Sequence, residues 1–581
     1  MTANNTFKII LIKPSHYDDH GYVIQWVRSL IPSNSLASIY GLILDCVERQ
    51  VLGPDVAIEI AAYDETNTRI KVNKLARGLT APGAGGLVCL VGVQSNQFPR
   101  AVDIARQFRA RGIQVCIGGF HVSGCLAMLP GVQPDLQEAV DHGISLFAGE
   151  AENRMEQILQ DAYAGELQPI YNFMHDLPDI EYTPTPYLPV QNINRNLANE
   201  TTFDAGRGCP FLCSFCTIIN VQGRKSRRRS PEDVERIVRA NYQNGINYYL
   251  VTDDNFARNK DWEAVLDRLI ELREKENLPV KLILQVDTMC HKLPNFIDKA
   301  VRAGTHKVFI GLESINPESL AIARKKQNRI TEYRTMFQAW KARGVVTYAG
   351  YILGFPNDTP ETIIRDIEII KRELPVDVLE FFILTPLPGS EDHKRLYDQN
   401  VWMDPDMNNY DVIHVTAEHP KMSTVEWRNV YDRAWDTYFS LEHVKTLLYR
   451  ARVSSIPVKR MANIAFGFYA SHLTEHVHPM ESGLFRRKYR TDRRPTLKRE
   501  SVLVFYPRYL WEVLRKSVVA LRVYMSFQRL AREVERDPVG DAYTDIALTP
   551  VSDGELDEFE MFTATDAAKS AVEKVRRRQV A

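Results

Sequence analysis

The chain has 581 residues, of which 45% are hydrophobic and 25% charged, and its 72 basic residues nearly balance 73 acidic ones. This composition is typical of a soluble globular protein, and the length exceeds one ordinary core, so about two to four domains are expected. A formal net charge of −1 excludes a global attraction to nucleic acid or to a membrane, so such contacts would need a local patch.

The start of the chain and the number of cysteines indicate in which cellular compartment the protein is expected. Met-Thr-Ala-Asn-Asn-Thr runs directly into an apolar segment, without the basic and apolar regions of a signal peptide. No stretch approaches the ~18 consecutive apolar residues that a membrane span requires. Eight cysteines in a large chain without a secretory start are typical of a reducing compartment, so we expect a cytoplasmic protein.

Residues 1–165 alternate short apolar runs with helical patterns. The apolar runs lie at 7–14, 56–61, 87–93, 113–117 and 144–147, and clear helical patterns lie at 36–49 and 101–111. This alternation predicts a doubly wound α/β domain of the flavodoxin or Rossmann type, with a parallel sheet covered on both faces. Ligands of such sheets bind at the carboxyl ends of the strands. The loops expected there contain His20, Ser95, Gly118, Gly119, His121, Gly149 and Glu150.

After a proline-rich linker at 166–197, residues 198–392 contain a series of strand–helix units. The strands are expected at 201–206, 247–252, 280–286, 306–312, 345–353 and 378–384. This series predicts a partial (β/α)6 barrel of the TIM type, with chemistry at the carboxyl ends of its strands. The side chains expected at those ends are Asp253, Asp254, Glu313, Ser314, Gly350, Ile352, Gly354 and Pro386.

Three cysteines follow the first strand of this series, at C-x3-C-x2-C spacing: Cys209, Cys213 and Cys216. Soft thiolates this close together suit iron, and three of them on a four-iron cluster would leave one iron open to bind a small molecule. A zinc site completed by a histidine, or three unrelated buried thiols, would show the same spacing. No histidine occurs in the 60 residues that follow.

The C-terminal third is mainly helical and rich in aromatic residues, with a helical domain expected at 393–545 and a mobile tail at 546–581. A helix expected at about 509–535 carries an apolar stripe and several basic residues. With the basic segment 485–494 it predicts either a helix packed on the barrel or a peripheral membrane contact through 485–535. The basic run 224–229 is interpreted as a solvated face, so no nucleic-acid partner is expected.

The cysteine spacing, with Phe215 just before the last cysteine, resembles the signature of the radical S-adenosylmethionine (radical SAM) superfamily. The resemblance implies a [4Fe-4S] cluster on the three cysteines, reductive cleavage of S-adenosylmethionine to a 5′-deoxyadenosyl radical, and an electron donor such as flavodoxin or ferredoxin. Similar family motifs at the strand ends imply S-adenosylmethionine contacts from Phe215, Asp253, Asp254, Glu313, Ser314, Gly350, Ile352, Gly354 and Pro386. The family's Gly-Gly-Glu after the second strand is replaced here by aspartates, and Asn357 stands where a glutamate is usual.

The N-terminal pattern looks like the cobalamin-binding domain that precedes many radical SAM modules. Gly118-Gly119-x-His121 after one strand and Gly149-Glu150 after the next carry this resemblance, which implies cobalamin near these residues, Ser95 and His20. Val23 stands where the cobalt-ligating motif Asp-x-His-x-x-Gly has its glycine, and both histidines also fit loop or capping positions.

The combined resemblance implies a cobalamin-dependent C-methyltransferase that acts on an unactivated carbon of a small molecule or lipid. The alternatives are a radical SAM cyclase or oxidoreductase without methyl transfer, and a non-catalytic iron–sulfur or zinc protein.

Overall fold

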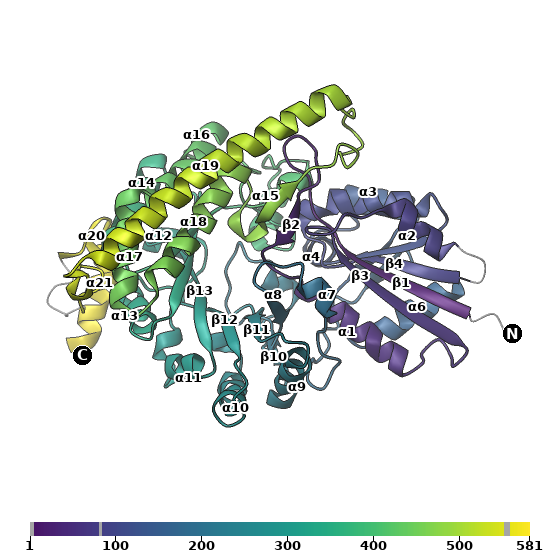
Figure 1. Ribbon diagram of the computed structural model, residues 1–581, viewed down its shortest axis with the longest axis horizontal. Helices are drawn as coiled ribbons and strands as arrows, with labels where there is room; N and C mark the ends of the chain where they lie inside the picture. The colour runs from purple at the N-terminus through teal and green to yellow at the C-terminus, as the bar shows by residue number, and fades with distance from the viewer. Residues whose placement is uncertain (1–4, 81–83, 551–557, 581) are drawn as a thin grey trace.

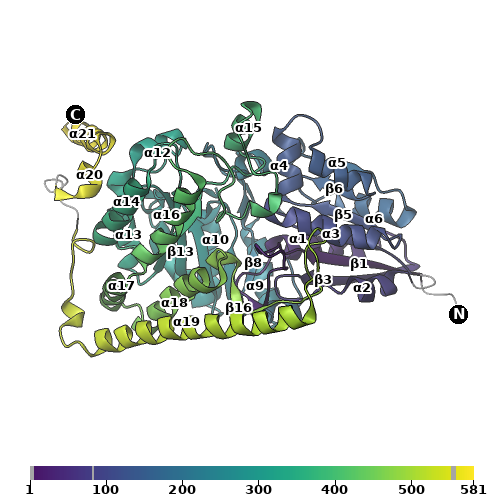
Figure 2. The same cartoon turned by 90° about the horizontal axis from the view of Figure 1, so that it is seen from above.

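The computed structural model describes residues 5–80, 84–550 and 558–580. Figure 1 shows an N-terminal sheet domain at one end, a central barrel, and C-terminal helices that pack on the barrel. The last of the long helices, α19 (Val502–Arg536), runs along one edge of the molecule, beginning near the N-terminal domain and ending beside the barrel helices (Figure 2).

The N-terminal domain is built on a six-stranded parallel sheet in the order β3-β1-β4-β5-β6-β7. Its strands are β1 (Asn5–Lys13), β3 (Val56–Asp64), β4 (Ala84–Leu90), β5 (Gln114–Gly118), β6 (Ser145–Ala148) and β7 (Ile170–Asn172). The helices are α1 (Asn34–Glu48), α2 (Val72–Leu79), α3 (Phe98–Arg109), α4 (Phe120–Met128), α5 (Pro134–Asp141) and α6 (Met155–Ala164).

Alternate residues of β1 enter two separate cores. Ile9 and Leu11 pack with α1, whereas Ile10 and Ile12 pack with α3 on the other face. The doubly wound fold is therefore confirmed, because an apolar strand buried on both faces needs helices on both sides. The domain extends further than its predicted end at residue 165, since β7 of the expected linker adds a strand.

The central sheet contains six parallel strands in the order β15-β14-β13-β12-β11-β8, which confirms the partial barrel. The strands are β8 (Thr201–Phe203), β11 (Tyr248–Val251), β12 (Lys281–Val286), β13 (Thr305–Glu313), β14 (Val346–Leu353) and β15 (Val378–Ile383). The helices from α7 onward are α7 (Val190–Ile193), α8 (Ile218–Val221), α9 (Pro231–Tyr242), α10 (Trp262–Glu274), α11 (Phe296–Arg302), α12 (Pro317–Ile322), α13 (Ile330–Lys341) and α14 (Pro360–Glu373).

The C-terminal region is helical, and it also returns to the N-terminal domain. Its main helices are α15 (Glu391–Asp398), α16 (Thr424–Tyr438), α17 (Leu441–Val453), α18 (Val458–Glu475) and α19. The strand β16 (Gly483–Arg487) pairs antiparallel with β2 (Gln25–Ser29), so segments from opposite ends of the chain form one small sheet.

The prediction of a mobile tail at 546–581 is wrong for residues 558–580, which pack on the barrel. Residues 558–580 contain α20 (Glu560–Thr563) and α21 (Asp566–Val580), and α20 buries Met561 and Phe562. The Glu373 carboxylate accepts hydrogen bonds from the amides of residues 560 and 561, which fixes the segment against α14. Most of the acidic stretch 553–560 lies outside the described residues. None of the described helices is both long and apolar enough to cross a bilayer.

Candidate active site

The three cysteines lie on a loop whose two ends are tied together. The short strand β9 (Gly206–Arg207) pairs antiparallel with β10 (Arg227–Arg228), and the Cys209 amide donates to the carbonyl of Gly223 at 3.2 Å. Gly208 has φ +88°, and a Cβ there would lie 2.5 Å from the Lys225 carbonyl oxygen. The loop therefore closes tightly because a glycine stands where its two ends meet.

The three thiols lie close enough to influence one another's ionisation. Burial raises the pKa of Cys209 to about 11 and that of Cys216 to about 12, and the charge of Cys213 adds to both shifts. No three His, Cys, Asp or Glu side chains of the described residues form a set compact enough for one metal ion. Each thiolate of a cluster binds its own iron, so a cluster does not require three side chains within reach of one ion.

A buried ion pair borders the cysteine loop. Lys325 bonds with Glu313, and its ammonium also interacts electrostatically with Cys213 and Cys216. The same ammonium lies 5.8 Å from the centre of the Phe215 ring. The neighbouring Arg324 is instead exposed and pairs with Glu391 at 2.8 Å. The next residue, Asp392, accepts a hydrogen bond from the Ser214 hydroxyl of the loop.

The two adjacent aspartates after β11 have different environments. Asp253 accepts hydrogen bonds from the Ala205 amide at 2.7 Å and from the Asn259 side chain, so it supports the backbone that leads into the loop. Asp254 accepts from the Gly208 amide at 3.0 Å and lies near Cys209 and Cys216. Burial raises the pKa of both carboxyls to about 7. Of the two, Asp254 is the carboxylate that faces the cysteines.

An apolar patch lies beside the loop. Ile352 packs with Ala323 and Phe355, and the partly buried rings of Phe215 and Phe382 complete the cluster with Leu384. The remaining predicted strand-end residues have structural contacts. Gly350 lies against the rings of Phe309 and Phe382, Pro386 is buried, and the Ser314 hydroxyl accepts from the Asn316 amide.

The structure gives Gly354 a packing role. Its φ is +106°, and a Cβ there would lie 1.9 Å from the Trp427 ring of α16. The Trp427 indole donates to the Leu353 carbonyl at 3.1 Å. The glycine therefore admits a helix of the C-terminal region against the end of β14.

A cavity of about 170 Å³ lies at the carboxyl ends of the N-terminal strands. Gly118, Gly119, Gly149 and Glu150 line it, as predicted, and so does Arg207 from the cysteine loop. Ser95 and His121 do not: the His121 ring bonds to the Ser95 hydroxyl at 3.2 Å and to Asp135 at 2.8 Å. This histidine is held between two loops as a structural residue.

His20 lies outside this cavity. The loop after β1 turns toward the C-terminal region, where His20 is exposed beside a second hollow of about 340 Å³. His414 in that hollow contacts Asp411 at 2.9 Å and Asp19 at 3.3 Å. Burial lowers the pKa of His414, but the two aspartates outweigh burial and raise it to about 10.

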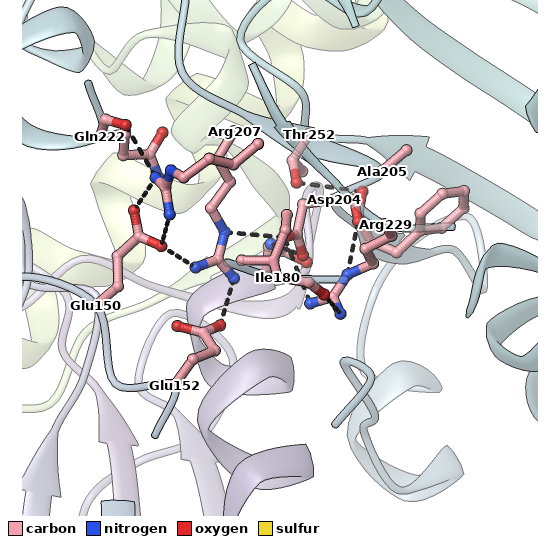
Figure 3. Close-up of polar contacts among 12 residues, drawn as sticks. Glu150, Glu152, Ile180, Asp204, Ala205, Arg207, Gln222, Arg229 and Thr252 are labelled. Carbon is pink, nitrogen blue, oxygen red and sulfur yellow. Dashed lines mark hydrogen bonds and ion pairs between the residues drawn. The ribbon is translucent and has the colours of Figure 1, made fainter. Parts of the chain in front are cut away.

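Charged side chains join the cysteine loop to the N-terminal sheet (Figure 3). The Arg207 guanidinium donates to Glu150 at 2.6 Å, to Glu152 at 2.7 Å and to Asp204 at 2.9 Å. Arg227 also pairs with Glu150, at 2.7 Å. Two domains thus meet through buried ion pairs two residues away from Cys209.

Only part of the basic run 224–229 is the solvated face that its composition predicts, since Arg224 and Lys225 are exposed and Arg227 and Arg229 are not. Arg229 is fully buried, donates to the Asp204 carbonyl at 3.0 Å and lies 3.5 Å from the Asp204 carboxylate. Arg227 is also largely covered, by the Glu150 contact and by the Pro178 carbonyl. These two arginines are covered because carboxylates from two domains converge on them, and nothing local in the sequence marks these partners.

Comparison with known protein families finds a match within the barrel. A model described as the Radical SAM superfamily matches residues 205–370, which include the cysteine loop and the strands β11 to β14. Residues 205–370 are a radical SAM domain. The chain therefore contains a radical SAM domain, which supports an enzyme with a [4Fe-4S] cluster and S-adenosylmethionine as cofactors over a non-catalytic iron–sulfur or zinc protein.

Relatives extend the similarity beyond the radical SAM domain. Bacteriochlorophyllide d C-8(2)-methyltransferase of Chlorobaculum tepidum is 26% identical over 350 residues, which cover 57% of this chain and 73% of the relative. Hopanoid C-2 methylase of Rhodopseudomonas palustris is 26% identical over 58% of this chain and 63% of the relative. The solved structure of the cobalamin-dependent S-adenosylmethionine radical enzyme OxsB, with aqua-cobalamin and S-adenosylmethionine bound, superposes with a TM-score of 0.52 at 13% identity. It covers 93% of this chain and 82% of OxsB, which shows a shared fold.

Proposed function

We propose that this radical SAM enzyme is a cobalamin-dependent C-methyltransferase that acts on an unactivated carbon of a small molecule or lipid. The methylase names of two relatives and the fold shared with a cobalamin-dependent enzyme support the proposal. The observation that carries it is the position of the N-terminal cavity, which shares Arg207 and Gln222 with the cysteine loop. A ligand in that cavity would lie beside the cluster.

The cavity lining fits the nucleotide part of cobalamin. Its lining combines glycines and apolar side chains with a few polar groups. The Ser38 hydroxyl and the side-chain amide oxygen of Asn34 are buried there without a hydrogen-bond partner among the described residues. Buried polar atoms without partners are costly in a folded protein, so these two indicate a ligand that completes their hydrogen bonds.

The residues around the cysteine loop divide the S-adenosylmethionine contacts among them. We assign Cys209, Cys213 and Cys216 to the cluster. Asp254 is assigned to the ammonium group of S-adenosylmethionine because it faces the thiols. Lys325 is placed for the carboxylate of S-adenosylmethionine, since its own ammonium already lies within electrostatic reach of the cysteines. The patch around Ile352 and Phe215 offers an apolar surface for adenine. When bound, the cluster supplies the electron that cleaves S-adenosylmethionine and cobalamin supplies the methyl group.

The test is anaerobic reconstitution of the full chain with iron, sulfide and hydroxocobalamin, followed by dithionite and S-adenosylmethionine. Mass detection of 5′-deoxyadenosine measures radical cleavage, and S-adenosylhomocysteine measures methyl transfer. We expect both products. Formation of 5′-deoxyadenosine without S-adenosylhomocysteine would instead indicate the cyclase or oxidoreductase alternative.

Two variants of Ser38 test cobalamin binding in the cavity independently of the iron–sulfur cluster. Ser38→Leu should fill the cavity and abolish retention of cobalamin, measured by its absorbance after gel filtration. Ser38→Ala is the matched control, because it removes the hydroxyl but leaves the space. The iron content should be the same in both. Equal cobalamin retention in the two variants would place the cofactor elsewhere.

A further inference from the structure

The helix α19 shows an apolar stripe on its outer side. Six large side chains recur at intervals of three, four or seven residues, which places them on one face of a helix. They are 40–86% exposed: Leu503, Leu510, Leu514, Val518, Leu521 and Met525. Contiguous exposed apolar surface of this length marks an interaction site rather than ordinary surface.

Contacts on the opposite side fix the rotation of the helix. Phe505 is buried against Tyr22, and Lys516 pairs with Glu475 at 2.7 Å. Further along, the Phe527 ring stacks at 6.3 Å on the ring of Tyr469. Because the inner face is held along the helix, the apolar stripe points away from the barrel and the N-terminal domain. Figure 2 shows that α19 lies at the edge of the molecule, and the side chains of the stripe are exposed among the described residues.

A row of arginines borders the apolar stripe. Arg508, Arg515, Arg522 and Arg529 recur at intervals of seven residues and are exposed. Residues 502–532 contain six basic residues and one acidic residue, Glu512, which is paired with Lys488 and Lys516. The 66% exposed ring of Trp511 lies between the stripe and the row on the helical projection. An apolar stripe, a tryptophan at its border and a basic edge match the layers of a lipid–water interface.

An apolar groove continues from the stripe. A cavity of about 930 Å³ lies between α18, α19 and β16, and Leu521 belongs to both its lining and the stripe. Its rim includes Phe485, which is 69% exposed and has φ +52°. A bulky residue held in the left-handed region with its ring in solvent is strained, and such positions cluster at ligand and switch sites. The groove is the right size for part of a hydrocarbon chain.

We propose that α19 and β16 form a docking surface for an anionic lipid bilayer. The apolar stripe and Phe485 lie at the boundary between headgroups and acyl chains, the arginine row contacts anionic headgroups, and the groove receives an acyl chain. A second copy of this chain fits less well, because a two-fold antiparallel pairing of two stripes would bring the two arginine rows together. The inference does not depend on methyl transfer.

The test is co-sedimentation of the full chain with vesicles of phosphatidylcholine alone or mixed with phosphatidylglycerol. We expect binding to the mixed vesicles that weakens as salt is raised. Replacing Arg515, Arg522 and Arg529 by glutamine should lower the affinity on the order of 100-fold, since each cation near an anionic surface contributes about 1 kcal/mol. Replacing Leu510, Leu514 and Leu521 by serine should abolish binding.

The controls change exposed arginines and exposed apolar residues elsewhere on the surface. Glutamine at the exposed arginines Arg236, Arg302 and Arg343, or serine at the exposed residues Val425 and Leu441, should leave vesicle binding unchanged. Formation of 5′-deoxyadenosine without vesicles reports whether each variant is folded and loaded, so loss of docking and loss of the proposed chemistry remain distinguishable.

Two results would overturn the inference. One is the absence of binding to mixed vesicles, or binding that the α19 variants do not weaken. The other is a dimer in solution that the leucine variant dissociates, together with no vesicle binding by the unchanged protein. This result would assign the stripe to a second copy of the chain.

Discussion

Arg207 offers a sharp test of how the two domains are joined. In Arg207→Met, Glu150 keeps Arg227 and Asp204 keeps Arg229. Among the described residues, Arg207 is the cation paired with Glu152, so that buried carboxylate loses its partner. Leaving one member of a buried ion pair without its partner costs about 3–5 kcal/mol. We expect the free energy of unfolding to fall by that amount near neutral pH.

The pH dependence of this loss follows from the Glu152 carboxyl. Burial raises the pKa of Glu152, but Arg207 more than compensates and holds that pKa below its ordinary value. The ion pair therefore stabilises the fold at pH values above the ordinary pKa of a glutamate, and this stabilisation is lost as the pH falls through the lowered pKa. Without the arginine, burial alone would raise the pKa, and the carboxyl could take up a proton as the pH falls. The deficit of the variant should therefore shrink between pH 8 and acidic pH.

The assay is urea unfolding of the full chain followed by tryptophan fluorescence. Arg207→Met with Glu152→Leu should recover most of the lost stability, because an apolar pair can replace a buried ion pair. Arg302→Met, which breaks an exposed pair with Glu274, is the control and should leave the urea midpoint unchanged. The reasoning fails if Arg207→Met behaves like this control, or if the double variant is as unstable as the single one.

Three further predictions follow from the site and its surroundings. His414→Asn should flatten the pH dependence of stability between about 6.5 and 10, measured by urea midpoints, because the raised pKa of His414 stabilises the fold below 6.5 and that contribution is lost as the pH rises toward 10. Gly354→Ala should lower the free energy of unfolding by about 3 kcal/mol, since its Cβ would overlap Trp427 at a positive φ. Asp254→Asn should weaken S-adenosylmethionine binding by about 1.5–3 kcal/mol in calorimetry, through loss of a charged hydrogen bond, while the amide oxygen still accepts from Gly208 and the fold persists.

The strands and helices of both sheet domains were predictable because their signal is local. Apolar runs such as 7–14 and 345–353 contain enough buried residues in succession to identify a strand without its neighbours. Pairings between distant segments were not predictable in the same way. The strands β2 and β16 are short and meet only because the C-terminal region folds back, and β7 has three residues.

The site shows the same division between local and distant information. The cysteine spacing and the strand-end aspartates were readable from the sequence, but the choice of Asp254 over Asp253 depends on which carboxylate supports the backbone. Lys325 and Arg324 are adjacent basic residues, and only the turn after α12 decides which of them faces the thiols. The partners of Arg207 lie in another domain, and no spacing rule connects them.

The double variant at Arg207 and Glu152 also tests what the interdomain ion pairs are for. The cysteine loop has little regular structure, so its position depends on its ends, and one end is held by Arg207 against the edge of the cavity. If the pairs only stabilise the fold, an apolar replacement that restores stability should restore both products. If they also set the distance between the cavity and the cluster, 5′-deoxyadenosine should form at the normal rate while S-adenosylhomocysteine falls, because cleavage needs only the barrel and methyl transfer needs both domains. A stable double variant that makes both products at normal rates would show that the ion pairs have no positioning role.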